Sequence, residues 1–197
     1  MQILQILRVI VLSGAFLAGP SVADNARPQP LGIPLGADRK VVESIFEKAQ
    51  IKTIGANPEG GFLGYKRAPK SIEDGGEILL HFHKDKLARI ALTIKIESQQ
   101  AHPYISRYES LKANLTKKYG KPDRDIENMD STYSDHPLLA IKTGKSQRLC
   151  GWKKDNLFVL LGLMGDNFKV NFTLAYAYLP LWDEYTQEQE DEEASNL

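Results

Sequence analysis

The sequence predicts an α+β protein made of two units, each a helix lying on an antiparallel sheet. Apolar residues recur at helical spacing in two segments, 39–50 and 103–119. After each segment, apolar and polar residues alternate with a period of two, which is typical of a sheet with one buried face. Two strand pairs centre on a similar turn, Lys84-Asp85-Lys86-Leu87 and Lys154-Asp155-Asn156-Leu157. A tandem duplication explains this order, and turn chemistry shared by chance is the alternative.

The first unit is expected to span residues 24–100, with its helix from about 39 to 50 and strands at 51–54 and 62–66. A hairpin follows over residues 77–96. One row of that hairpin is apolar and predicted to pack under a helix: Ile78, Leu80, Phe82 and alternate residues from 88 to 96. The opposite row is predicted to face solvent and carries His81, His83, Arg89 and Lys95.

The second unit is expected to span residues 101–182. Its helix begins near Pro103 and ends near Gly120, both of which suit those helix positions. A charged loop at 123–130, short strands at 131–133 and 138–142, and three longer strands at 148–152, 157–164 and 168–178 are predicted to follow. Residues 183–197 hold seven acids and no Lys or Arg, and composition predicts a disordered tail.

Residues 1–23 are interpreted as an export signal. Arg8 precedes an apolar run from Val9 to Gly19, and Ser21-Val22-Ala23 supplies the small residues that a signal peptidase reads. We therefore expect cleavage after Ala23, a periplasmic or secreted location, and no stable membrane insertion after cleavage; an uncleaved anchor is the alternative.

The body of the chain resembles small exported bacterial domains. Gly32-x-x-x-Gly36 stands ahead of a Val-rich helix, and a second helix ends in Lys118-Tyr119-Gly120-Lys121-Pro122. This is similar to β-lactamase-inhibitor-protein-like domains and to the related small lipoproteins of outer-membrane assembly. The resemblance implies paired helices on an antiparallel sheet, sometimes in tandem, with roles in protein binding and envelope assembly. It assigns no functional residue. The chain also departs from that group, because each unit has one helix and Pro20 stands where a lipidated Cys would be.

Catalytic motifs are missing from the sequence. It has no Gly-x-Ser-x-Gly and no His-Glu-x-x-His, and the single Cys150 lies between apolar neighbours, so we expect no enzyme and no cofactor. A reactive Cys150 is the enzymatic alternative. His81 and His83 lie two apart on one strand and would face the same way; with His102 or His136 they would make a zinc or copper site, but no motif places the other ligands.

The sequence therefore predicts an exported binding protein that acts through protein–protein interaction, of the inhibitor, immunity or envelope-assembly type. The alternative is a periplasmic metal- or small-ligand-binding protein that uses the His81/His83 face. Nucleic acid is not an expected partner, because the chain has no dense basic stripe. The open face of the sheet supplies the candidate binding residues His81, His83, Arg89 and Lys95. Phe62, Tyr65 and Arg67 are added as candidates because aromatic and Arg side chains are enriched at interfaces; Phe62 and Tyr65 as core residues are the alternative.

Overall fold

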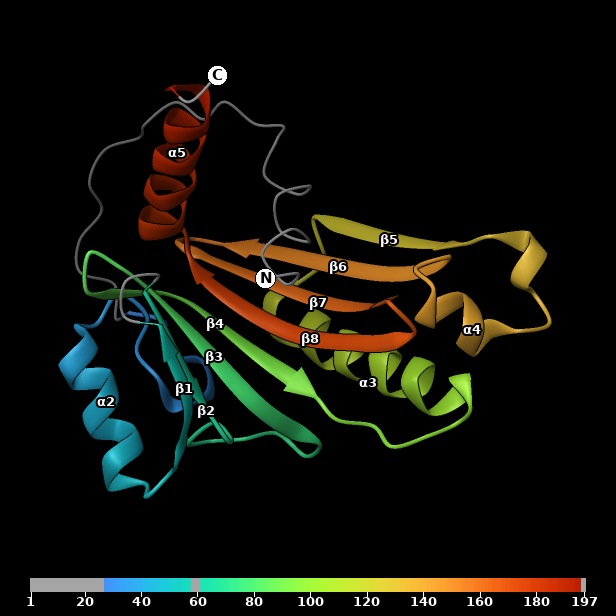
Figure 1. Ribbon diagram of the computed structural model, residues 1–197, viewed down its shortest axis with the longest axis horizontal. Helices are drawn as coiled ribbons and strands as arrows, with labels where there is room; N and C mark the ends of the chain where they lie inside the picture. The colour runs from blue at the N-terminus through green and yellow to red at the C-terminus, as the bar shows by residue number, and fades with distance from the viewer. Residues whose placement is uncertain (1–26, 58–60, 196–197) are drawn as a thin grey trace.

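Residues 27–57 and 61–195 are described by the computed structural model, and over these residues the protein forms one antiparallel sheet of eight strands with helices on it (Figure 1). The predicted α+β class is confirmed. The expected signal peptide, residues 1–23, lies outside the described residues. The strands are β1 (Thr53–Asn57), β2 (Phe62–Tyr65), β3 (Gly75–His83), β4 (Lys86–Ile94), β5 (Arg124–Met129), β6 (Ser146–Lys154), β7 (Leu157–Asp166) and β8 (Lys169–Tyr178).

Both halves of the chain run from a helix into four strands. In the first half α2 (Arg39–Lys48) precedes β1 to β4, and in the second half α3 (Ala101–Tyr119) precedes β5 to β8. The strand order is β1-β2-β3-β4-β8-β7-β6-β5, so the last strand of each half pairs with the other at the centre of the sheet. The two predicted units therefore share a single sheet, and the tandem duplication itself stays a prediction.

The turn between β3 and β4 explains why the central hairpin forms. Lys84 and Asp85 are the two loop residues between the paired His83 and Lys86, and both have positive φ. A two-residue hairpin loop of this kind matches the twist of its strands, and Asp tolerates the left-handed conformation well. The pairing slips by one residue after His81, which makes Ala88 the extra residue of a bulge in β4.

One face of the sheet carries the main core. Alternate residues of β3, β4, β6, β7 and β8 pack there against α2, α3 and α4 (Pro137–Lys142), as Phe46, Tyr108 and Ile141 illustrate. We call this the inner face. The predicted apolar row of β3 lies on it, since Ile78, Leu80 and Phe82 are all buried in this core.

The C-terminal helix α5 (Leu179–Ser195) lies on the opposite, outer face. It starts directly after β8 and projects away from the end of the sheet (Figure 1). Trp182 from its first turn is buried in a second, smaller cluster with alanines of the central strands and Leu160. Those alanines alternate along the strands with core residues of the inner face, which places the smaller cluster on the other side.

Three local predictions differ from the structure. The acidic segment 183–197 was expected to be disordered, yet α5 is helical to Ser195, because its Glu, Gln and Ala residues favour a helix and Trp182 fixes its first turn. The charged segment expected to be a loop is the edge strand β5, which exposes most of its side chains. The short strands expected at 131–133 and 138–142 are a 3-10 turn, η2 (Ser131–Tyr133), and helix α4; the chain also has a 3-10 turn η1 (Pro30–Gly32) near residue 30.

Candidate functional site

The first turns of α5 lie on the outer face of the sheet, over Phe62, His81, His83 and Arg89 of β2, β3 and β4. We call these four residues the seat. Small side chains at Ala88, Ala91, Ala175 and Ala177 leave room above the central strands, and Trp182 fills this space with only 4% of its surface exposed. Large aromatic side chains dominate the burial energy of such contacts. Trp182 is therefore the main apolar anchor of the helix.

Aromatic rings and imidazoles pack together beside this anchor. The His81 ring is stacked on Phe62 at 4.3 Å between centroids. From α5, Tyr185 and Trp182 meet His81 edge-on, at 4.4 and 5.6 Å. Tyr185 also lies 5.7 Å from the ring of His83. Edge-on contacts between aromatic rings at these distances are favourable, so the cluster holds the base of α5 in one orientation.

Arg89 is a buried charge under the helix. It is 3% exposed, and its Nε and Nη2 donate no hydrogen bond to any described residue. The guanidinium carbon lies 5.2 Å from the ring of Trp182, a cation–π contact. Burial lowers the pKa of Arg89 to about 10. A cation removed from water without a carboxylate partner is costly, so Arg89 is the least satisfied charge that the structure places here.

Burial also keeps His81 neutral. Its pKa is lowered to about 4, first by burial and then by electrostatic interaction with Arg89 and His83. Nδ1 of His81 is buried and has no hydrogen-bond partner among the described residues. At neutral pH the ring is therefore an uncharged aromatic surface with one unused polar atom.

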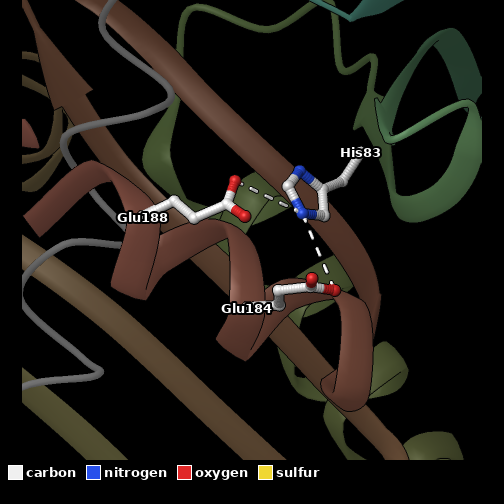
Figure 2. A group of neighbouring side chains, drawn as sticks. All are labelled: His83, Glu184 and Glu188. Atoms are coloured by element: carbon white, nitrogen blue, oxygen red, sulfur yellow. Dashed lines mark ion pairs between the residues drawn. The ribbon is translucent and has the colours of Figure 1, made fainter. Parts of the chain in front are cut away.

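A cluster of charged side chains lies beside the seat, at the end of β3. Glu184 and Glu188 of α5 both point at the imidazole of His83 (Figure 2), with Nε2 at 3.8 Å from Glu184 Oε2 and 3.6 Å from Glu188 Oε2. The other oxygens, Oε1 of each, contact Nζ of Lys84, at 2.8 Å for Glu188. Hydrogen bonds to both carboxylates raise the pKa of Lys84 to about 12, and the bond from Lys84 lowers the pKa of Glu184.

In comparisons with family models, curated proteins and solved structures, nothing matched the chain. The resemblance to inhibitor-like and outer-membrane-assembly domains therefore stays a prediction. Along the described residues, no helix combines the length and the apolar character that a membrane crossing requires.

The candidate binding residues separate into two groups in the structure. Phe62, His81, His83 and Arg89 lie together in the seat of α5, on the predicted face, but His81, His83 and Arg89 are buried and do not face solvent as expected. The physical reason is that α5 covers them.

The other three candidates lie elsewhere. Tyr65 is buried on the inner face, where its ring is stacked on Phe46 at 3.7 Å. Lys95 is exposed and paired with Glu77 at 3.4 Å, and Arg67 is exposed. These three are not part of the seat.

The structure also shows where the residues of the alternative metal site and the alternative reactive thiol lie. His102 and His136 are exposed and do not join His83, whose neighbours are the two glutamates of α5. Cys150 is fully buried in the main core, and burial raises the pKa of its thiol to about 11. A thiol in such surroundings is a poor nucleophile.

Sequence reasoning missed Trp182, Tyr185, Glu184 and Glu188 as members of the site. Trp182 and Tyr185 are three apart and Glu184 and Glu188 are four apart, which places each pair on one side of a helix. That spacing was the available signal. The acidic composition of the tail pointed to disorder instead.

Proposed function

We propose that this protein is an exported binding protein that acts through protein–protein interaction, and that its binding surface is the seat of Phe62, His81, His83 and Arg89. The observation that carries the proposal is Arg89, a buried cation whose Nε and Nη2 have no hydrogen-bonded partner within residues 27–57 and 61–195. An inhibitor, an immunity protein or an envelope-assembly factor would each use such a surface.

The chemistry of the seat favours a partner that brings a carboxylate. The carboxylates that α5 brings to the edge of the seat, Glu184 and Glu188, contact Lys84 and His83 and do not pair with Arg89. A partner segment with an Asp or Glu at Arg89 would form a charge-assisted hydrogen bond that no described residue of the free chain makes at Nε or Nη2. An aromatic side chain of the same segment would take the place of Trp182 on the small alanines.

Partner access requires α5 to move off the seat, and its contacts permit this. The ion pairs with Lys84 involve side chains that are about half exposed, and exposed ion pairs contribute little to stability. The apolar anchor consists of the buried Trp182, with the partly buried Leu181 and Tyr185 beside it. In the free chain α5 therefore occupies the surface that a partner segment would take.

Site-specific crosslinking tests the proposal. A photoreactive amino acid replaces Phe62 in the seat or, as a control, Phe168, which is exposed on the loop between β7 and β8. We expect the Phe62 probe, and not the Phe168 probe, to capture one specific protein from envelope extracts. Arg89→Met should then weaken the affinity for that purified protein at least tenfold, since truncating a buried charge at an interface costs several kcal/mol. Lys95→Met serves as the matched control.

Two results would contradict the proposal. One is a Phe62 probe that captures no protein, or the same proteins as the Phe168 probe. The other is a captured protein whose affinity is unchanged by Arg89→Met.

A further inference from the structure

The cluster at the end of β3 has the composition of a metal site. His83 is the last residue of β3, and Glu184 and Glu188 are one helical turn apart on α5. One nitrogen atom of His83 and one oxygen atom from each glutamate all lie within 4.8 Å of one another. Figure 2 shows both carboxylates directed at the same imidazole.

The buried nitrogen of His83 is a second observation that points to a ligand between these groups. The His83 residue is 7% exposed, and its Nε2 has no hydrogen-bond partner among the described residues. Separations of 3.6 and 3.8 Å from Nε2 to the nearest glutamate oxygens are too long for hydrogen bonds. Two ligand atoms on one tetrahedral zinc ion are about 3.4 Å apart, given metal–ligand distances of about 2.1 Å. The two His83–glutamate separations therefore need only a small contraction to hold an ion, and the glutamate oxygens lie within 4.8 Å of each other.

We propose that Nε2 of His83 and Oε2 of Glu184 and Glu188 bind a divalent first-row transition-metal ion of the zinc class. The ion joins β3 to α5. The inference goes beyond the proposed function, because the ion would bind to the free chain, in which α5 lies over the seat.

Lys84 supports this geometry and does not block it. It contacts Oε1 of both glutamates, so Oε2 of each remains directed at His83. Carboxylates that bind metals are commonly held by a hydrogen bond to their other oxygen, which is the role that Lys84 fills. Two carboxylates against one ammonium group also leave a net negative charge, which attracts a divalent cation.

The ligand types select the class of metal. One imidazole nitrogen with two carboxylate oxygens suits zinc and its neighbours, whereas calcium and magnesium prefer sites made wholly of oxygen. The glutamate side chains are 44% and 49% exposed, so water reaches the site and completes the coordination. An ion held in this way would fasten α5 over the seat.

Zinc titration by isothermal calorimetry tests the inference on the full chain, purified without a histidine tag. We expect one zinc ion per chain, and Glu188→Gln, Glu184→Gln or His83→Gln should each weaken the affinity by more than about tenfold. Glu192→Gln, an exposed acid of α5, and His102→Gln, an exposed histidine, are the matched controls and should bind zinc as the wild type does.

A second measurement separates this site from a surface site. Zinc should slow amide hydrogen exchange in the first turns of α5 in the wild type and not in Glu188→Gln. Failure of the wild type to bind zinc would overturn the inference, as would unchanged binding in both Glu188→Gln and His83→Gln. The Glu188 side chain is half exposed, so its variant is expected to fold even if His83→Gln does not.

Discussion

Replacing Arg89 by methionine is expected to stabilise the folded protein. Methionine keeps the unbranched, apolar stem that fills the space under Trp182. It removes the charge whose Nε and Nη2 find no hydrogen-bonded partner in the described part of the chain. Replacing buried charges by apolar residues of similar volume is often neutral or stabilising. A gain in stability would show that the charge is not present to stabilise the fold.

The size of the gain follows from the pKa of Arg89. Burial lowers this pKa from 12.5 to about 10, which corresponds to about 3 kcal/mol against the charged form in the folded state. Arg89 is a base whose pKa is lower in the folded chain than in the unfolded chain. The free-energy cost of its buried charge is therefore fully present below pH 10 and disappears above pH 12.5. The variant also loses the cation–π contact with Trp182, and this loss offsets about 1–2 kcal/mol of the gain in stability. The expected net gain at neutral pH is about 1–2 kcal/mol, or about 2–8 °C in Tm.

Urea unfolding of Arg89→Met and the wild type at pH 7 measures this difference. Lys95→Met is the matched control, since Lys95 is an exposed base just beyond the same strand, and we expect it to change stability by less than about 0.5 kcal/mol. A loss of more than 1 kcal/mol in Arg89→Met would refute the reasoning. It would mean that Arg89 is a structural cation, and the main support for a binding role of the seat would be lost.

Three further predictions concern other positions. Lowering the pH from 6.5 to about 4 should destabilise the protein through His81. The unfolded chain takes up a proton at this side chain near pH 6.5, whereas the folded chain does so only near pH 4. His81→Phe should therefore remove up to about 3 kcal/mol of the loss in stability. Gly165→Ala should cost about 1–3 kcal/mol or more, since a Cβ would lie 2.0 Å from the carbonyl oxygen of Ile141. The Cys150 thiol should not react with a thiol reagent in the folded protein at pH 8, because it is buried and its pKa is about 11.

These predictions have simple controls. The His81 prediction is measured as a difference between variant and wild type in urea midpoints from pH 4 to 8, and parallel curves would contradict it. Gly55→Ala has open space at its Cβ, so a cost equal to that of Gly165→Ala would show that crowding is not the cause. Cys150 should become reactive in denaturant, and equal labelling rates in folded and unfolded protein would show that the thiol is not protected.

The faces of the central hairpin could be predicted from the sequence because strand alternation depends on local spacing. Ile78, Leu80 and Phe82 lie in the main core as expected, and His81 and His83 lie on the other face. The exposure of that other face could not be predicted in the same way. That exposure is set by α5, which covers this face although it is distant in sequence: Lys84 and its partner Glu184 are 100 residues apart.

The elements predicted wrongly are those whose sequence patterns fit more than one kind of structure. β5 reads as a charged loop because it is an edge strand whose side chains are mostly exposed and pair with Arg148 and Lys112. The apolar run in α4 is six residues long, and such a short run fits a strand as well as a helix. Helix α5 reads as disordered because its apolar content is low, and one tryptophan decides where it lies.

The position of β8 has a consequence for how the chain folds. β8 is the last strand in sequence, yet it lies in the middle of the sheet between β4 and β7. Until it arrives, β4 and β7 each present an unpaired edge beside a strongly apolar face, the arrangement that promotes aggregation. Bringing β8 to β4 also closes a loop of more than 70 residues, which slows folding relative to local contacts. The nascent chain is therefore most vulnerable just before its final strand is available, and slowing or truncating synthesis near residue 168 should lower the yield of folded protein.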